Sequence, residues 1–164
     1  MSNTKKIVRF DAQARATLLS GVNILADAVK ITMGPCGRNV VIANPDGQPV
    51  LTKDGVTVAR AVNLSDKFPD IGVQLIKEAA ARTADVAGDG TTTATVLAQS
   101  IFSEGLRLLA AGFKPSAVKK GIEAATSDVL MYLNSASIPV TKDEEIRQVA
   151  TISANNDTEV GELI

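Results

Sequence analysis

Long runs of apolar residues at helical spacing, each ended by glycine or proline, constrain the fold of this sequence most. A helix repeats every ~3.6 residues, so apolar side chains three or four positions apart share one face. From Ala12 to Ile31 this spacing is kept by Ala14, Leu18, Val22, Leu25 and Val29. The pattern predicts a helix that stops at Gly34-Pro35, because glycine tolerates a left-handed end position and proline cannot continue a helix. We expect Asp11 to be its N-cap and Phe10 to pack as a hydrophobic staple.

Two more long helices are predicted in the middle of the chain. One runs from Asp66 to about Val86, with an apolar face made of Phe68, Ile71, Gly72, Leu75, Ile76 and Ala79. After Gly88-Asp89-Gly90, the other runs from Thr91 to about Ala111. Because that helix is apolar on more than one side, we expect it to lie in the core.

Between the first two helices the sequence predicts a β-hairpin. Residues 39–43 and 49–52 are β-rich, and residues 44–47 contain the Asp-Gly pair of a tight turn. The pattern of residues 56–64 leaves a loop and a short helix both open.

The C-terminal part predicts shorter elements. Pro115 begins a helix that ends at a break over residues 135–139, the best candidate for a domain boundary. Residues 141–144 (Thr-Lys-Asp-Glu) have the pattern of a capping box and predict a short helix. Asn156 or Asp157 can cap a last helix, but too few residues follow for stability alone. We therefore expect the chain to be a piece of a longer protein.

Composition excludes several classes of function. The 17 Lys and Arg residues balance the 18 Asp and Glu residues, which gives no support to nucleic-acid binding. The chain has no histidine and one cysteine, so a His/Cys metal site, a Ser-His-Asp triad and a disulfide framework are excluded. Neither a signal peptide nor a membrane-spanning apolar run is apparent. We expect a cytoplasmic protein that does not bind a membrane.

The strongest chemical signal is the run from Gly88 to Thr95, Gly-Asp-Gly-Thr-Thr-Thr-Ala-Thr. Glycines allow close approach of a ligand, and the N-terminus of the following helix favours phosphate. Threonine hydroxyls add donors, whereas the Asp89 carboxylate is suited to Mg²⁺. The run matches neither a P-loop nor a Rossmann fingerprint. A helix–turn–helix whose Asp and Thr residues only cap is the alternative reading.

Two further segments carry weaker signals. Residues 32–38 form a Gly- and Pro-rich loop that could pack along a ligand, or could simply end a helix. Lys53 and Asp54 stand beside Gly55, where the lysine could pair with phosphate and the carboxylate could orient water. A solvated turn with a surface ion pair is the alternative for this second segment.

Taken together, these segments resemble the group I chaperonins, the bacterial GroEL family. The most specific match is the run from Ala87 to Gln99, AGDGTTTATVLAQ. Further matches follow in order at residues 23–30, 34–35, 37–41, 52–60, 104–106 and 151–155. The resemblance covers essentially the whole chain. It implies a mainly helical fold with a small β-hairpin, in which residues 1–136 form the N-terminal half of an equatorial ATP-binding domain. Residues 137–164 would then begin an intermediate hinge domain.

The resemblance also implies a set of site residues for ATP and Mg²⁺. Lys53 matches a lysine near the phosphates, Asp54 a carboxylate implicated in hydrolysis, and Asp89 the Mg²⁺ ligand. The nucleotide loop and phosphate cradle correspond to Thr32, Met33, Gly34, Pro35, Gly90, Thr91, Thr92 and Thr93. Ile152 and Ser153 match residues at the pocket edge. Cys36 departs from the family, which commonly has lysine there.

By resemblance, the function is that of an ATP-dependent chaperonin that assists protein folding. Its partners would be unfolded client proteins, a co-chaperonin and identical subunits in a ring. The family's apical domain and C-terminal equatorial half are not in these 164 residues, so hydrolysis by the chain alone should be slow or absent. The alternatives are a non-catalytic fragment that binds nucleotide or joins full-length rings, and a truncated product without a function.

Overall fold

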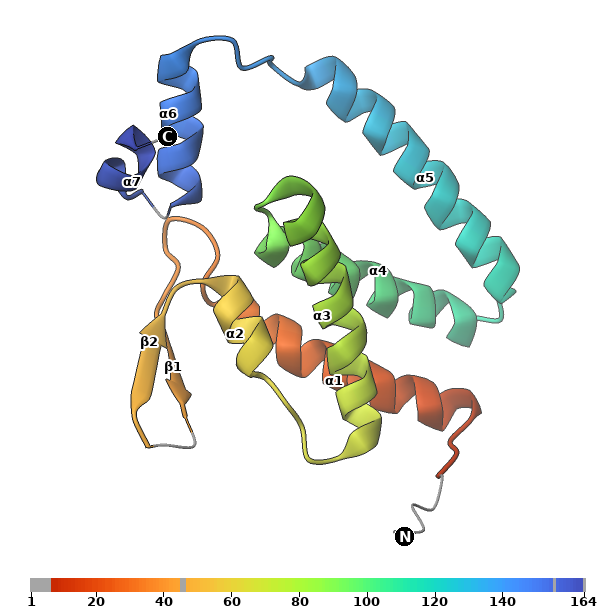
Figure 1. Cartoon of the computed structure of the whole chain (residues 1–164). Helices are drawn as coiled ribbons and strands as arrows, with labels where there is room; N and C mark the ends of the chain where they lie inside the picture. The colour runs from red at the N-terminus through yellow and green to blue at the C-terminus, as the bar shows by residue number, and fades with distance from the viewer. Residues whose placement is uncertain (1–6, 45–46, 155, 164) are drawn as a thin grey trace, which may run out of the picture. The chain divides into compact units, whose positions relative to one another are not determined.

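The computed structural model describes residues 7–44, 47–154 and 156–163. It is mostly helical and has one two-stranded hairpin (Figure 1), so the predicted fold class is confirmed. The chain divides into two compact units, one up to Gly112 and one from Phe113 onward. The predicted domain boundary between residues 136 and 137 stays a prediction. None of the described helices is long and apolar enough to cross a membrane.

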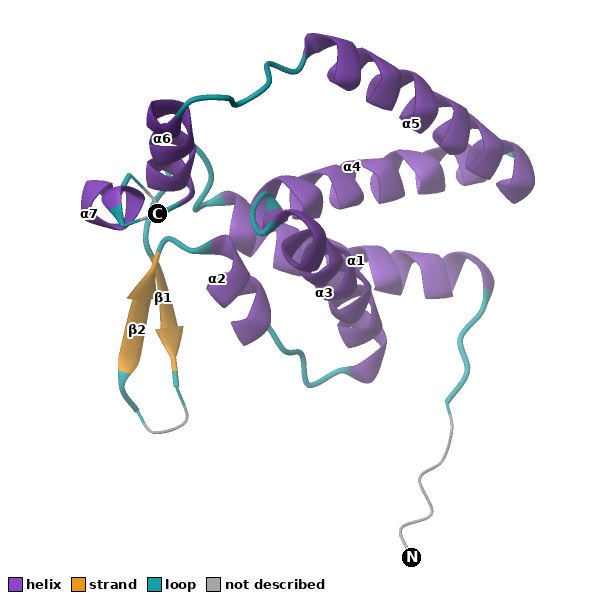
Figure 2. Cartoon of the chain, turned by 45° about the horizontal axis from the view of Figure 1, so that its top comes forward, coloured by secondary structure: helices purple, strands orange, loops and turns teal. Residues whose placement is uncertain are grey.

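Over its described residues, the first unit contains four helices and the hairpin; Figure 2 shows these helices and strands by colour. The helices are α1 (Asp11–Lys30), α2 (Gly55–Ala61), α3 (Lys67–Ala87) and α4 (Thr91–Ala110). The segment that sequence left open between a loop and a short helix is therefore the helix α2. Strands β1 (Val40–Ala43) and β2 (Pro49–Thr52) pair antiparallel, with Val40 opposite Thr52. The expected turn includes residues 45 and 46, which lie outside the described residues.

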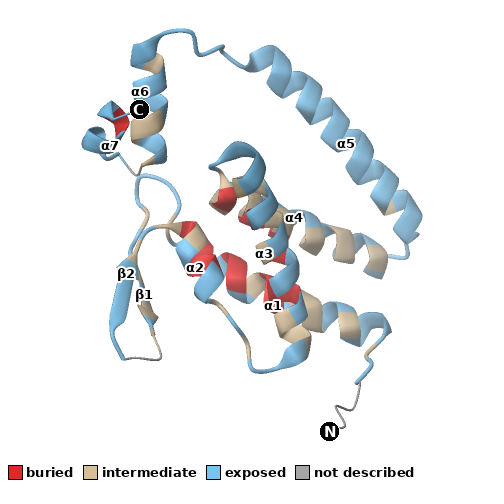
Figure 3. Cartoon of the chain, in the orientation of Figure 1, coloured by how far each residue is buried: buried red, intermediate tan, exposed pale blue. Residues whose placement is uncertain are grey.

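Helix α1 provides the centre of the core. Its buried residues pack against α2 and α3 in one apolar cluster made of Val22, Leu25, Val29, Val58, Ala59, Val73 and Ile76. Figure 3 shows these buried positions gathered where the helices of the first unit meet. Such burial provides about 25 cal/mol per Å² of apolar surface and is the main stabilising contribution available to this unit.

Helices α1 and α3 approach so closely that their backbones touch. A Cβ atom on Gly72 of α3 would overlap the carbonyl oxygen of Leu18, and one on Gly21 of α1 would overlap that of Pro69. Both glycines are buried in helix interiors, where glycine is about 1 kcal/mol worse than alanine. The close contact between the helices explains why this cost is tolerated.

The expected burial of α3 and α4 was wrong in part. On α3, Ile71 and Leu75 are each 48% exposed, whereas Val73 and Ala80 join Gly72 and Ile76 in the buried set. Apolar residues occupy two faces of α3, and periodicity alone did not reveal which face meets α1. Helix α4 lies in the core only in part. Ala98 and Phe102 pack against the apolar cluster, but the fully buried residues of α4 are polar and its other apolar residues are partly exposed.

The predicted start of α1 was also wrong. Asp11 is the first helical residue, not the N-cap, and it has a positive φ of 56°. Phe10 occupies the N-cap position and is 72% exposed, so it forms no staple. Instead, the guanidinium of Arg9 stacks 4.1 Å from the centre of the Phe68 ring and ties the chain entrance to α3.

The second unit contains α5 (Pro115–Ala136), α6 (Asp143–Ser153) and α7 (Thr158–Glu162). Pro115 begins α5 as predicted, but no residue of this helix is buried. The capping box of α6 is shifted by one residue from the prediction. Glu145, not Glu144, accepts from the backbone N–H groups of Thr141 and Lys142, because Glu144 pairs with Arg147. Asp157 caps α7, as one of the two predicted alternatives.

We expect Gly72→Ala to lower the free energy of unfolding by about 1–3 kcal/mol, because the added methyl group would force α1 and α3 apart. Chemical denaturation followed by circular dichroism measures this change. Gly121→Ala on α5 is the matched control: a Cβ there meets nothing within 4 Å, so that variant should be as stable as wild type or more so. A Gly72→Ala protein with wild-type stability would contradict the close packing.

Candidate functional site

Two segments that sequence analysis singled out meet beside the last turn of α1. Gly55, the first residue of α2, packs against the Thr92 side chain at the start of α4, and a Cβ there would overlap Oγ1 of Thr92. The same Cβ would lie 3.3 Å from Cγ1 of Val29 near the end of α1. The structure therefore brings together the Lys53-Asp54 segment, the threonine run and the last turn of α1.

The loop after α1 is held in a closed shape by its own backbone. Arg38 N–H donates to the carbonyl oxygen of Ile31 at 2.8 Å, and Gly37 N–H donates to that of Gly34 at 3.0 Å. The Thr32 hydroxyl donates to the Val29 carbonyl at 2.8 Å and so anchors the loop to α1. Gly34 has a φ of +75°, which favours glycine. Around it, Met33, Pro35 and Cys36 are exposed and available to a ligand.

Asp54 is the N-cap of α2, a role that the sequence prediction missed. Its Oδ1 accepts from Val56 N–H at 3.2 Å, and its Oδ2 accepts from Thr57 N–H at 3.0 Å and from the Thr57 hydroxyl at 2.5 Å. The signal was present, since Asp is among the preferred N-cap residues of helices. Lys53 precedes it and is exposed.

These bonds lower the pKa of Asp54. Burial raises the pKa of this carboxyl, but the hydrogen bonds from Thr57 and Val56, with the nearby Arg60 charge, outweigh burial and hold the pKa below its ordinary value of 3.8. Asp54 is therefore ionised at neutral pH. An ionised carboxylate with a low pKa can orient water or contact a cation, but it is a weak general base.

The turn between α3 and α4 is built on two glycines. Gly88 ends α3 with a φ of 73°, and Gly90 is the N-cap of α4 with a φ of 82°. Because Gly90 has no side chain, nothing at the N-cap position itself shields the first turn of α4 from a ligand. Asp89 is exposed between the two glycines, and its Oδ1 accepts from Gly90 N–H at 2.6 Å. The three threonines that follow differ in exposure: Thr91 is buried, Thr92 half-buried and Thr93 exposed.

The donor set fits a magnesium–phosphate ligand better than a metal held by protein alone. Among the described residues, no group of three or more His, Cys, Asp or Glu side chains could hold a metal ion. Mg²⁺ needs no such cage, since it usually takes one or two carboxylates and completes its shell with water and phosphate oxygens. Asp89 beside a helix N-terminus supplies the carboxylate and the anion-binding end together.

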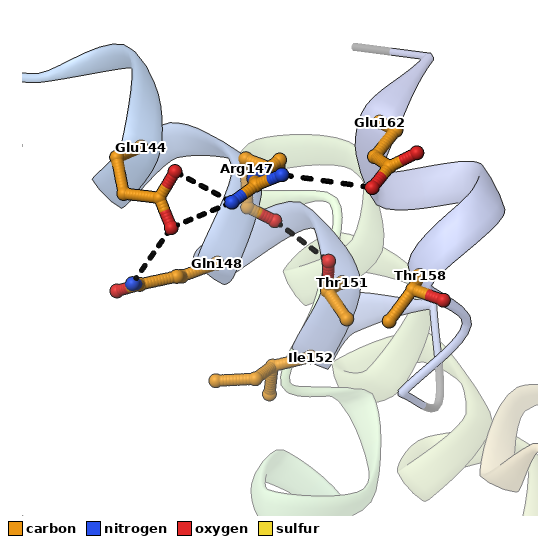
Figure 4. A pocket seen from close by; sticks show the side chains of 7 residues that line it. All are labelled: Glu144, Arg147, Gln148, Thr151, Ile152, Thr158 and Glu162. Atoms are coloured by element: carbon orange, nitrogen blue, oxygen red, sulfur yellow. Dashed lines mark hydrogen bonds and ion pairs between the residues drawn. The ribbon is translucent and has the colours of Figure 1, made fainter.

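The remaining two predicted site residues lie in the second unit, at the end of α6. Ile152 is 69% exposed and lines a cavity of about 510 Å³ between α6 and α7 (Figure 4). Ser153 is exposed. Their predicted place at the edge of a nucleotide pocket stays a prediction.

The cavity between α6 and α7 is not an open anion site. Arg147 lies 2.6 Å from Oε2 of Glu144 and 3.6 Å from Oε1 of Glu162, so two carboxylates already compensate its charge. The hydrogen bond from Arg147 holds the pKa of Glu144 below its ordinary value, which keeps that carboxylate ionised. The ion pair between Arg147 and Glu162 links α6 to α7.

We expect Asp54→Ala to lower the free energy of unfolding by about 1 kcal/mol near pH 7, the usual cost of losing an N-cap. The folded-state pKa is lowered, so this stabilisation is complete above about pH 4 and is lost as the pH falls through the folded pKa. The difference in the free energy of unfolding between wild type and variant should therefore become smaller in denaturant titrations at successively lower pH. Asp128→Ala on the exposed face of α5 is the control. A difference in the free energy of unfolding that does not change with pH would contradict the capping role.

Comparison with known proteins places the fold. A profile of the TCP-1/cpn60 chaperonin family matches residues 25–164, which is most of the chain. The crystal structure of a group III chaperonin in the open state is similar over 92% of this chain, with a TM-score of 0.75 and 28% sequence identity. This chain spans 30% of the length of that chaperonin. The predicted family is confirmed at this level, whereas membership of group I stays a prediction. The chain belongs to the TCP-1/cpn60 chaperonin family.

Proposed function

We propose that this chain is the nucleotide-binding portion of a group I chaperonin, an ATP-driven machine whose complete form assists protein folding. The observation that carries the proposal is the packing of Gly55 against Thr92 and Val29. That packing brings a carboxylate at one helix start and a threonine-rich helix start to the last turn of α1, which carries the third segment, the closed glycine-rich loop. Each of the three alone has an ordinary capping explanation, but their convergence is typical of a site for a phosphorylated ligand.

Each predicted residue has a role in this proposal. Asp89 binds Mg²⁺, and residues 90–93 cradle the phosphates through backbone N–H groups and hydroxyls. Residues 32–35 line the nucleotide. Lys53 pairs with phosphate, and the ionised Asp54 orients water near it. The bound magnesium would supply charge neutralisation on the phosphate oxygens.

The proposal extends to the architecture of the complete protein. Residues 1–136 form the N-terminal half of the equatorial domain, and residues 137–164 begin the intermediate domain. An apical domain and a C-terminal equatorial segment would come from the rest of such a chain, since these residues span 30% of the matched chaperonin. The partners are identical subunits in a ring, unfolded client proteins and a co-chaperonin, in the cytoplasm.

A second candidate function is nucleotide binding without efficient turnover, by a fragment that joins full-length rings. Two observations favour it. The pKa of Asp54 lies below its ordinary value, which weakens this carboxylate as a general base. Helix α5 has no buried residue, and its last turns expose a row of large apolar side chains, namely Val129, Leu130, Met131, Tyr132 and Leu133. Such a row favours association with further protein.

We expect Asp89→Ala to abolish the magnesium-dependent part of ATP binding, because the carboxylate that holds the ion is removed. Calorimetric titration of ATP with and without magnesium measures this. Asp85→Ala removes the same charge from an exposed position one turn earlier and should bind as wild type. Magnesium-dependent binding that survives in Asp89→Ala would sink the metal assignment, and a wild-type chain that binds no nucleotide would sink the proposed function.

Thr91→Ala should weaken ATP binding by about two- to tenfold, less than Asp89→Ala does, because one hydroxyl is lost while the backbone donors remain. The same titrations compare the two variants, with circular dichroism to verify folding, since Thr91 is 8% exposed. Equal losses in both variants would show that the Thr91 hydroxyl matters as much as the metal ligand and would contradict the phosphate cradle.

A further inference from the structure

Helix α4 turns a polar stripe inward, which is unusual for a helix with so many apolar residues. Thr91, Thr95 and Gln99 recur every four positions and are 8%, 1% and 7% exposed. On the other side, Leu97 is 55% exposed and Ile101 is 48% exposed. Among the described residues, no buried side-chain nitrogen or oxygen lacks a hydrogen-bond partner. Thr95 donates to the Thr91 carbonyl within α4 at 2.9 Å, whereas the hydrogen bonds of Gln99 reach α1.

Gln99 makes the bonds that join the two helices. Its Nε2 donates to Oδ1 of Asn23 at 2.8 Å and to Oδ1 of Asp27 at 3.2 Å, across 76 and 72 positions of sequence. Asn23 and Asp27 are four residues apart and therefore lie on one face of α1. Apolar contact is non-directional and allows helices to slide, whereas two hydrogen bonds from one amide require one position along the partner helix.

We propose that Gln99 is a positioning residue for the nucleotide site: it fixes α4 along α1 and so holds the start of α4 opposite the loop that follows α1. The two-turn segment from Thr91 to Gln99 is about 12 Å of stiff helix. A shift at Gln99 is therefore carried to residues 91–93, while the loop at residues 32–35 stays attached to α1 by the Thr32 hydrogen bond. This inference rests on the proposed function, because it concerns the same site.

Gln99→Leu tests the inference, because leucine keeps the packing volume and removes both hydrogen bonds. We expect the affinity for magnesium–ATP to fall about tenfold, as small displacements of binding groups weaken a site strongly. Gln74→Leu is the matched control, since Gln74 also donates to a carboxylate, at 3.2 Å on Asp70, but within α3 and at an exposed position. Both variants are assayed below their unfolding transitions, with circular dichroism on the same samples.

A distance measurement separates this inference from the proposed function. Cys36, the single cysteine, lies in the loop after α1 and is exposed, so it accepts a spin label. A second label at Ser100→Cys, on the exposed side of α4, reports the position of α4 by pulsed electron resonance without nucleotide. Gln99→Leu should shift or broaden the label-to-label distance, whereas Gln74→Leu should leave it unchanged.

A charge exchange covers the case in which Gln99→Leu fails to fold. Gln99→Glu places a carboxylate against Asp27 and should weaken ATP binding, and adding Asp27→Asn should restore it, because the new amide can donate to the new carboxylate. Variants that lose stability but keep both the label distance and the affinity would reduce Gln99 to a structural residue and overturn the inference. If wild type binds no nucleotide, the proposed function fails, and the label distance alone decides whether Gln99 sets the position of α4.

Discussion

Gly21 on α1 lies against the carbonyl of Pro69, and Gly72 on α3 lies against that of Leu18, so the two helix backbones touch. The packing of the first unit depends on this contact. Any side chain at either position would separate the helices and open the apolar cluster around Val22, Leu25 and Val73. Because α1 also contacts α2 and α4, a displaced α1 would move every element that carries the candidate site. The packing of the core and the geometry of the site therefore both depend on the position of α1.

The candidate site is built from helix ends. Helix α1 ends at one side of it, and α2 and α4 begin at the other, with Gly55 allowing the close approach of Thr92. Rigid helices transmit their packing to their ends, and the loop after α1 adds hydrogen bonds of its own backbone. The hydrogen bond from Gln99 in the polar stripe of α4 fixes the position of α4 along α1. The apolar cluster cannot do this, because apolar contact is non-directional.

Sequence predicted the elements well and their burial less well. Caps and breakers gave the ends of α3 and the start of α5, because Asp66, Gly88 and Pro115 act locally. The buried face of α3 was missed because Ile71 and Leu75 are as apolar as the residues that are buried, and the choice is made by α1. The Gly55–Thr92 and Gln99–Asp27 contacts could not be predicted from spacing, since each joins residues far apart in the chain. For the site, the motif resemblance identified the residues, and the fold showed that the Lys53-Asp54 segment and the threonine run meet beside the last turn of α1.

The central claim is that magnesium–ATP binds where the end of α1, the start of α2 and the start of α4 meet. Backbone amide NMR of the ¹⁵N-labelled chain, titrated with magnesium and a non-hydrolysable ATP analogue, tests it most directly. The account predicts that the largest shift changes cluster at residues 32–34, 53–57 and 89–93, while the amides of α5 stay unchanged. Shift changes confined to the cavity between α6 and α7, or no changes at saturating nucleotide, would contradict the account.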